Sequence, residues 1–440
     1  MMGMTSVTVG IISVIAIVVS IYAGAHIAIA LGTISFIGVI LIRGNVEVAV
    51  DLLSLAMADS IADEAFATVP AFVMMGLVVS RAGLGRDIYE FADELFRPVR
   101  GGLGIATVAA NAIFASVTGS SIASASVFTK VAIPEMLRFG YGRRFAVGVV
   151  AGSSVLGMII PPSVMLIIYA VVTEQSVGAM FLAGVVPGLL LTVAYCTSIP
   201  LLHAFAPGFV GGRAGRAEAA PLAKLVMDLA TKVGPVALLV FIVLGGIYGG
   251  VLTPVESGAA GTIAAMIMGF IKRRLSWEAI WQALVETGHI SANILFLIIA
   301  ASIYSRMLGV AGLPTLFGEW LASINLPFAG FMVIYVLLLL ALGTIIDTAS
   351  IILIVVPLFL HALEPFNVNL IWFGIVTVIG AEIGLLTPPF GISCFVIKAA
   401  IGDQSISLRD VFMGALPFAA VMLLVLGVLI AFPRLSLLFI

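Results

Sequence analysis

The chain has 440 residues, of which 62% are hydrophobic and only 10% charged, and its formal net charge is -2 at pH 7. Its mean hydropathy is +1.27, whereas roughly a quarter of the residues in soluble domains are charged, so the composition excludes a soluble protein and indicates a multi-pass protein of the lipid bilayer. The near-neutral charge points to no nucleic-acid partner. The two cysteines, Cys196 and Cys394, are too few for a disulfide framework or a metal cluster.

Several charge-free segments are long enough to cross a bilayer, which takes roughly 20 apolar residues. They cover residues 5–42, 101–129, 145–173, 176–212, 321–346 and 411–432. With the shorter apolar runs included, we expect an all-α polytopic membrane protein with about eleven transmembrane helices. The first apolar run lacks a basic start and a small-residue cleavage site, so we predict a transmembrane helix there and not a signal peptide.

A hydroxyl-rich turn, SVTGSSIASAS at residues 116–126, separates two apolar half-segments that are each too short to span comfortably. We interpret it as the tip of a re-entrant helical hairpin, with Ser120, Ser121 and Ser124 close to Gly119. Such oxygens suit a hard monovalent cation such as Na+, and a helix N-terminus at the tip offers N–H groups to an anionic substrate. The alternative is that these small residues only allow close helix packing.

The stretch GMIIPPSVMLIIYAV, residues 157–171, places Gly157, Pro161, Pro162 and Ser163 inside an apolar segment. A proline removes a backbone hydrogen bond and clashes with the preceding turn, so carbonyl groups are left unpaired at membrane depth. Such carbonyls must be buried in protein or bind something, and broken helices that hold coupling ions are one solution. A kink repaired by neighbouring helices is the structural alternative.

The longest polar interval, residues 206–232, is predicted to be a connecting loop with a short surface helix. It separates a first half, residues 1–205, from a second half, residues 233–440, and each half is expected to contain one hairpin and one broken helix. In the sequence TPVE, Glu256 is predicted to form a capping box with Thr253 at a helix start.

The second half contains a counterpart of the first tip, LGTIIDTASI, in which Gly343 is followed by Thr344, Asp347 and Thr348. A charge at the centre of a bilayer costs at least about 2.5 kcal/mol and usually marks function. Asp347 is therefore the strongest single candidate for a functional residue.

Three further charged residues, Lys130, Glu382 and Lys398, are predicted to lie within the membrane. The two lysines either extend to the interface or pair with a carboxylate.

A second broken helix is predicted from GLLTPPFGISCFVIK, which contains Gly384, Thr387, Pro388 and Pro389. Three blocks recur in the same order in both halves: residues 118–134 with 342–357, 157–171 with 384–398, and 175–190 with 404–421. Repeated halves with Gly/Pro-interrupted apolar segments indicate a secondary transporter with an internal, inverted repeat and with sites near the bilayer midplane.

No nucleotide-binding loop of the form G-x-x-x-x-G-K-[ST] occurs, and no H-E-x-x-H or G-x-S-x-G motif for hydrolysis. We therefore predict transport driven by an ion gradient, without ATP and without enzymatic activity. An intramembrane enzyme that uses Asp347 and Glu382 as an acid–base pair is the alternative, and it requires the two carboxylates to lie within hydrogen-bond reach.

The motifs VTGSSIASASVFTKVAIPEM, GSSVLGMIIPPSVMLIIYAV, GGIYGGVLTPVESGAAG and GLLTPPFGISCFV together resemble the large membrane subunit (DctM-like) of tripartite ATP-independent periplasmic (TRAP) transporters. The resemblance implies an elevator-type fold with two re-entrant hairpins and Na+-driven import of an organic anion, a carboxylate such as a C4-dicarboxylate or sialic acid, across the bacterial inner membrane. It also implies two partners, a small four-helix (DctQ-like) membrane subunit and a periplasmic substrate-binding protein. A stand-alone Na+/dicarboxylate symporter of similar architecture is the alternative.

Together, the residues and the resemblance predict Na+ ligands among Ser120, Ser121, Ser124, Gly157, Pro161, Gly343, Asp347, Thr348, Gly384, Thr387 and Pro388. Substrate contacts are predicted at Ser120, Ser121, Ser163, Thr344, Thr387 and Pro389.

Overall fold

The computed structural model describes residues 5–212, 220–324, 326–389, 391–402 and 405–440. In this part of the chain the regular structure is helical, apart from one isolated bridge between Tyr141 and Gly211. The expected all-α fold is confirmed.

The first half consists of successive helices joined by short connections. They are α1 (Ser6–Tyr22), α2 (Ile27–Arg43), α3 (Val46–Ala62), α4 (Ala65–Arg81), α5 (Leu84–Phe96), α6 (Gly102–Thr118), α7 (Ser121–Arg138), α8 (Arg143–Ser154), α9 (Leu156–Ile159), α10 (Val164–Val172) and α11 (Val177–Phe205). Local signals set several boundaries. The left-handed Gly44 caps the end of α2, and the Asn45 side chain accepts a hydrogen bond from Glu47 N (2.7 Å) at the start of α3.

The predicted connecting interval contains α12 (Pro207–Val210), α13 (Leu222–Asp228) and the π-helical turn η1 (Leu229–Val233), which leads directly into α14 (Gly234–Tyr248). Residues 213–219 of this interval lie outside the described residues. The remaining helices are α15 (Pro254–Ile271), α16 (Trp277–Ala311), α17 (Leu313–Ser323), α18 (Phe328–Gly343), α19 (Thr348–Leu363), α20 (Leu370–Leu385), α21 (Ile392–Ala400) and α22 (Leu408–Ala431), with short 3-10 turns after α19 and α22. The predicted capping box is confirmed, because Thr253 Oγ1 accepts from Glu256 N at 3.3 Å and Glu256 Oε2 accepts from Thr253 N at 2.8 Å.

By length and composition, five helical segments of the described chain are suited to cross a membrane, and up to seven if each of two bent pairs counts as one span. The five are Val177–Phe205, Leu222–Tyr248, Pro254–Ile271, Trp277–Ala311 and Leu408–Ala431. Shorter apolar helices of 10–17 residues, among them α1, α2, α6, α18 and α20, accompany them. The count of about eleven transmembrane helices stays a prediction.

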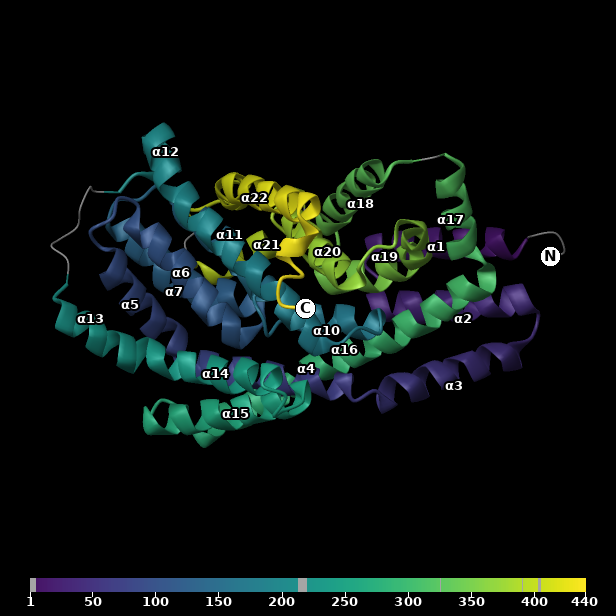
Figure 1. Cartoon of the computed structure of the whole chain (residues 1–440), viewed down its shortest axis with the longest axis horizontal. Coiled ribbons are helices and arrows are strands. Elements are labelled where there is room, and N and C mark those ends of the chain that lie inside the picture. Colours follow the sequence, from purple (N-terminus) through teal and green to yellow (C-terminus); the bar gives the residue numbers. More distant parts are fainter. Residues whose placement is uncertain (1–4, 213–219, 325, 390, 403–404) are drawn as a thin grey trace.

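The molecule is elongated (Figure 1), with α5, α6, α7 and α13 towards one end and α1, α2, α3 and α17 towards the other. Its most deeply buried helices are α6, α8 and α20; from Phe145 to Ser154 and from Trp372 to Leu385 every residue is buried. The surface exposes large apolar side chains such as Phe205, Phe241 and Val251. This arrangement is expected for a protein surrounded by lipid.

The two halves interleave around this core. Helix α8 of the first half packs against α22 of the second, and α20 of the second half packs against α11 of the first. In the same reciprocal way α7 contacts α21, and α19 contacts α10. Each half therefore completes the other's core.

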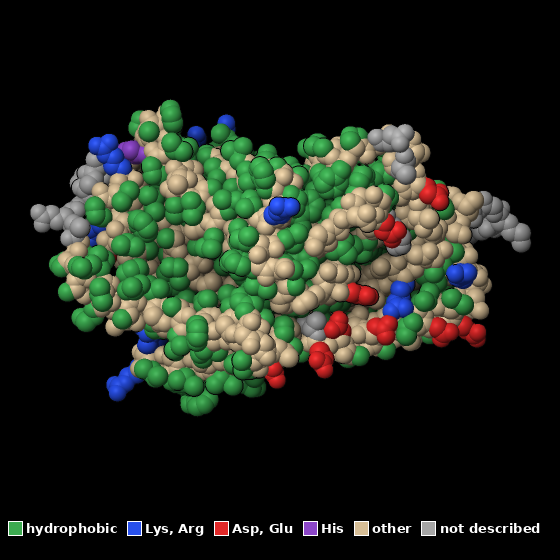
Figure 2. Space-filling model, in the orientation of Figure 1, with side chains coloured by type: hydrophobic (Ala, Val, Ile, Leu, Met, Phe, Trp, Pro, Cys, Tyr) green, Lys and Arg blue, Asp and Glu red, His purple; other side chains and the backbone are tan. Residues whose placement is uncertain are grey.

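On the face in Figure 2, hydrophobic side chains cover most of the surface and charged groups lie mainly at its margins. Basic side chains gather towards the end that holds α5 and α13, and acidic side chains towards the end that holds α3.

Candidate functional site

The first hydroxyl-rich turn joins two helices, as expected for a hairpin tip. Helix α6 ends at Thr118, Gly119 is left-handed (φ +58°), and the Ser120 side chain caps α7 by accepting a hydrogen bond from Ala123 N at 3.3 Å. Gly119 supplies the positive φ that reverses the chain within two residues.

Behind this tip, two hydroxyls of α7 are buried. Ser121 is 5% exposed and Ser124 is fully buried, and Ser124 Oγ has no hydrogen-bond partner among the described residues. A buried hydroxyl oxygen without a hydrogen-bond partner calls for an explanation, and at this predicted site a bound ion would provide one.

The first Pro-Pro sequence breaks a helix, as predicted. Helix α9 ends at Ile159, α10 begins at Val164, and the two segments meet at an angle of 43°. Ser163 Oγ donates to the carbonyl oxygen of Met158 at 2.6 Å. The repair of one freed carbonyl by a neighbouring hydroxyl is the structural role considered above for such a break.

The first tip lies directly against this break. Val164 N donates to Gly119 O at 3.4 Å, and a Cβ atom added to Gly157 would lie 2.8 Å from the Ser120 carbonyl group. A Cβ atom on Gly119 would lie 2.6 Å from Pro162 O. The glycines therefore let main-chain carbonyl groups of the tip and the broken helix come together.

The second tip has a different cap. Asp347 precedes α19; its Oδ2 accepts a hydrogen bond from Ser350 N at 3.3 Å, and its Oδ1 accepts one from Ser350 Oγ. Thr344, at the end of α18, donates to Ala341 O at 2.8 Å. The Asp347 carboxylate thus caps α19, and the positive, N-terminal end of the α19 dipole stabilises its negative charge.

The second tip also lies against its broken helix. A Cβ atom on Gly384 would lie 2.5 Å from Gly343 Cα, and Thr348 Oγ1 donates to Glu382 Oε1 at 2.6 Å. Thr387 Oγ1 donates to Ile383 O at 2.8 Å where α20 ends, and both Pro-Pro bonds, Pro161-Pro162 and Pro388-Pro389, are cis. The predicted residues therefore form two groups of the same design.

Some predicted residues stand apart from these contacts. Pro388 and Pro389 are exposed, and Lys398 donates to Ile406 O at 2.7 Å. Asp347 and Glu382 lie on separate elements, with Thr348 bonded to Glu382 between them.

A cavity of about 690 Å³ opens beside the first tip. Gly119 and Ser120 line it together with Ser126 and Lys130 of α7, and Arg81 of α4 closes another side. Lys130 is exposed and also borders a second pocket of about 440 Å³ between α5 and α7. Glu286 of α16 also lines the cavity and pairs with Arg81, so the N-terminus of α7 and Lys130 are the groups there that favour an anion.

Sequence reasoning missed Arg81. Its guanidinium pairs with Glu286 Oε2 at 2.7 Å and donates to Gln282 Oε1 at 2.8 Å, both on α16. The only sequence signal was a basic residue at the end of an apolar run, which is common at membrane interfaces.

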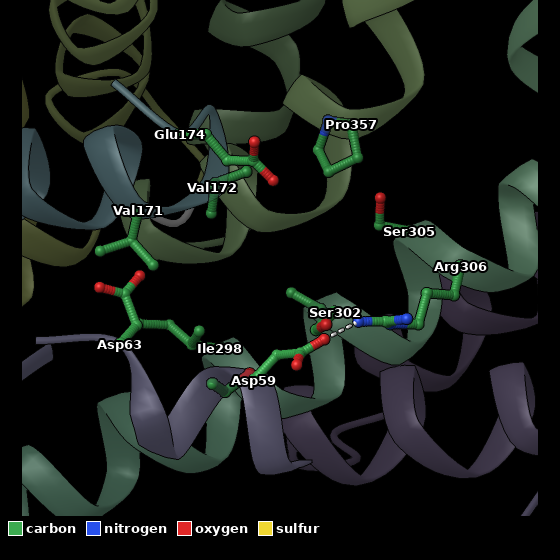
Figure 3. A pocket seen from close by; sticks show the side chains of 12 residues that line it. Asp59, Asp63, Val171, Val172, Glu174, Ile298, Ser302, Ser305, Arg306 and Pro357 are labelled. Carbon is green, nitrogen blue, oxygen red and sulfur yellow. Dashed lines mark hydrogen bonds and ion pairs between the residues drawn. The ribbon is translucent and has the colours of Figure 1, made fainter. Parts of the chain in front are cut away.

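A third pocket, of about 450 Å³, also was not predicted (Figure 3). Arg306 of α16 points across it to Asp59 of α3 at 2.5 Å, while Asp63 and Glu174 lie on its other sides. This pocket lies between α3, α16, α19 and the end of α10, away from both tips.

Comparison with known proteins distinguishes a transporter from an intramembrane enzyme. The model of the family described as "Tripartite ATP-independent periplasmic transporter, DctM component" matches residues 14–435. The chain belongs to this family. It is a TRAP transporter large permease, and therefore a transporter subunit and not an enzyme.

Curated relatives share this assignment. The chain is 33% identical to the C4-dicarboxylate TRAP transporter large permease protein DctM of Pseudomonas aeruginosa over 373 residues, which cover 84% of both chains. It is 29% identical to the sialic acid TRAP transporter large permease protein SiaM of Vibrio cholerae, again with 84% of both chains covered. It is also 29% identical to the isethionate TRAP transporter permease protein DctMQ of Oleidesulfovibrio alaskensis, and this match covers 94% of the chain and 64% of the relative.

Two solved transporter structures resemble the fold of the TRAP permease. Alcanivorax borkumensis YdaH matches with a TM-score of 0.53 and 15% identity over 88% of the chain and 90% of the YdaH chain. Neisseria gonorrhoeae MtrF matches with a TM-score of 0.55 and 12% identity over 97% and 94%. At this identity the likeness concerns the fold alone.

Proposed function

We propose that this TRAP permease couples the binding of Na+ to the import of an organic anion, a carboxylate, across the bacterial inner membrane. The observation that carries the proposal is the pairing of a hairpin tip with a Pro-Pro break in each half, at Gly119 and Gly157 and again at Gly343 and Gly384. Broken helices that present carbonyl oxygens and helix N-termini are the means by which secondary transporters hold coupling ions and anions.

The oxygen groups available at the two tips suit Na+. Ser124 Oγ is buried without a partner, and main-chain carbonyl groups approach each other at the first tip and break. At the second tip the Asp347 carboxylate adds a negative charge. Hydroxyl, carbonyl and carboxylate oxygens are the ligands that hard cations prefer.

The proposed substrate site is the cavity beside the first tip. Ser120 and the N-terminus of α7 face it, Lys130 supplies positive charge, and Arg81 lies beside it, paired with Glu286. Relatives are named for C4-dicarboxylates, sialic acid and isethionate, all of which are anions, and this agrees with a cavity that offers a helix N-terminus and Lys130.

An elevator motion of an inverted repeat is part of the proposal. The outer ends of the first hairpin are flanked by Arg97, Arg100, Arg138 and Arg143, which favours a cytoplasmic location for those ends. In this proposal the two hairpins enter from opposite sides, and the reciprocal contacts of the two halves support alternating access around a shared site.

As part of a three-component system, the permease is proposed to act with a small DctQ-like membrane subunit and a periplasmic binding protein. The family is described as a tripartite transporter, and the name of one relative, DctMQ, combines the M and Q components. The stand-alone symporter alternative predicts uptake by this chain alone in proteoliposomes. Uptake that requires the co-purified small subunit and the binding protein contradicts that alternative.

The coupling ion is tested by thermal unfolding of the purified protein in matched NaCl, KCl and choline chloride. A ligand at a hundredfold excess over its Kd stabilises the folded state by about 2.7 kcal/mol. We expect a rise in Tm that is specific to Na+, and that shrinks in Ser124→Ala and Asp347→Asn. Ser198→Ala serves as control, because Ser198 is a buried hydroxyl of α11 bonded to Tyr195 O, outside both tips. Equal melting in the three salts, for the permease and for its complex with the small subunit, would refute Na+ coupling.

A further inference from the structure

We propose that the anion carried by this permease has one carboxylate on an extended apolar body, as in an aryl- or alkyl-carboxylate, and is neither a C4-dicarboxylate nor a sugar acid. This inference rests on the proposed function, in which the cavity beside the first tip holds the substrate. The chemical class of the substrate then follows from the way charged and apolar side chains are distributed along that cavity.

The three long helices that line the cavity change from apolar to charged in the same direction. On α4 the lining residues run from Val73 to Arg81, on α7 from Ile122 to Lys130, and on α16 from Ile294 back to Glu286. On each helix the lining residues recur at intervals of three or four, so they share one face.

Two contacts show that the apolar ends and the charged ends coincide in space. Gly76 of α4 lies against the first tip, because a Cβ atom there would lie 2.8 Å from Thr118 O. Further along α4, Arg81 pairs with Glu286 of α16 at 2.7 Å. Lys130 lies about 14 Å from the start of α7, at a rise of about 1.5 Å per residue. The cavity therefore has an apolar floor at the first tip and a charged end away from it.

The charged end matches a single negative charge. The Arg81 guanidinium pairs with Glu286 and also donates to Gln282 Oε1 at 2.8 Å, so the charges of Arg81 and Glu286 offset each other. Of the charged lining residues only Lys130 is then left, and the lining carries one net positive charge. A second carboxylate on the substrate would lie near Glu286 without a cation of its own, and juxtaposed like charges oppose binding.

Apolar side chains from four helices enclose the floor. The cavity of about 690 Å³ has the size of sites that enclose drug-sized ligands, and a C4 acid would leave much of it as water against apolar walls. Each CH₂ group buried there should lower Kd by about fourfold. The wall residues are Val73 and Leu77 of α4, Met158 and Met165 on either side of the first Pro-Pro break, and Ile290 and Ile294 of α16.

Polar groups of the tip that border the floor are already bonded within the protein. Thr118 Oγ1 donates to Phe114 O at 3.0 Å, and Ser120 Oγ accepts from Ala123 N at 3.3 Å. The several hydroxyl groups of a sugar acid would lose water at the apolar walls without enough partners to replace it, which costs binding free energy.

A homologous series of ligands tests this inference on the purified permease with its small subunit in NaCl, by isothermal titration calorimetry. Phenylacetate, phenylpropionate and phenylbutyrate differ by one methylene group each, and we expect Kd to fall by about fourfold at each step. Succinate and N-acetylneuraminate should bind more weakly than phenylbutyrate. Phenylbutyramide, which lacks the negative charge, should bind at least about tenfold more weakly than phenylbutyrate, the effect of a loss of about 1.4 kcal/mol.

Two variants with matched controls locate the binding in the cavity. Ala123→Phe fills the floor and should abolish phenylbutyrate binding, whereas Ala292→Phe, at an exposed position of α16 outside the cavity lining, should preserve it. Glu286→Gln removes the negative charge and should improve the binding of succinate relative to phenylpropionate. Glu278→Gln, exposed on the same helix outside the lining, should not change this preference. The Glu286 pair keeps the inference testable if Ala123→Phe does not fold.

The outcomes separate this inference from the proposed function. Tighter binding of succinate or N-acetylneuraminate than of phenylbutyrate, lost in Ala123→Phe, would overturn the inference and leave the cavity as the substrate site. Equal binding of phenylbutyrate and its amide, or an unchanged preference in Glu286→Gln, would also overturn it. Anion binding that persists in Ala123→Phe, or no binding of any of these anions, would refute both the inference and the proposed substrate site.

Discussion

Two serines, one at the first Pro-Pro break and one behind the first tip, illustrate how similar residues take different roles. Ser163 satisfies a carbonyl group that the prolines leave free, whereas Ser124 is buried with no partner among the described residues. A buried hydroxyl without a bond costs free energy unless something else binds it. The sequence placed both serines near a predicted site, and only the hydrogen bonds distinguish them.

The contact between Gly157 and the first tip gives a prediction at the same scale. In Gly157→Ala the new methyl group meets the Ser120 carbonyl at 2.8 Å, and overpacking of this kind typically costs about 1–3 kcal/mol. We expect a lower Tm and a reduced Na+-dependent rise, measured in the same salt series.

Gly288→Ala is the matched control, because no neighbouring atom lies within 4 Å of a Cβ atom at that position in α16. It should preserve the Na+-dependent rise and add about 1 kcal/mol of helix stability. An undiminished Na+ response in Gly157→Ala would disconnect the tip contact from ion binding.

At the scale of elements, the crossing of α8 and α22 holds the two halves together. A Cβ atom on Gly148 would lie 2.0 Å from Gly414 O, and one on Gly414 would lie 2.0 Å from Arg144 O. Arg144 Nε also donates to Asp410 Oδ1 at 2.9 Å at the same crossing. Small residues are what allow backbones to approach so closely in membrane proteins.

We therefore predict that Gly414→Ala separates α8 from α22 and destabilises the protein by about 3 kcal/mol, at the upper end of the cost of overpacking. Gly427→Ala, in the same helix but with no atom within 4 Å, should leave the Tm unchanged or raise it. Equal Tm values for both variants, from thermal unfolding in detergent, would show that the crossing tolerates a wider separation.

A second element-scale prediction concerns α5. Asp87 is buried on this helix and pairs with Lys272 at 2.5 Å and Arg274 at 2.7 Å, both after α15. Asp87→Asn leaves two cations without a partner, and we expect a loss of about 3 kcal/mol, the lower end of the range for broken buried pairs, because both cations are partly exposed.

Arg86→Ala is the control for that change, because Arg86 pairs with Glu90 at an exposed position. Surface pairs contribute about 0–1 kcal/mol, so its Tm should barely change. If both variants melt alike, the Asp87 cluster does not anchor α5.

At the scale of the whole molecule, the reciprocal packing of the halves predicts how the chain behaves when it is divided. Fragments cut between residues 212 and 220 should co-purify when expressed together, because α8, α10 and α7 bury their faces against α22, α19 and α21. Either fragment alone should aggregate. A monodisperse single fragment on size-exclusion chromatography would contradict this, and would mean that each half folds independently.

The sequence by itself determined the helical membrane class, the family, and the positions of both tips and both breaks. These features depend on composition and on Gly, Pro and Ser at fixed local positions, whose backbone preferences act within a few residues. The capping box at Thr253 and Glu256 was predictable for the same reason.

Only the tertiary structure decided which groups meet. The pairing of each tip with its own break, the cavity lined by Arg81 and Lys130, and the hydrogen bond from Thr348 to Glu382 all join residues from different elements. In a bilayer the hydrophobic effect does not favour one helix pair over another, because lipid tails are as apolar as the helices. Close backbone contacts and buried hydrogen bonds therefore determine the packing. Those contacts act across tens to hundreds of residues, and the local pattern of the sequence does not contain them.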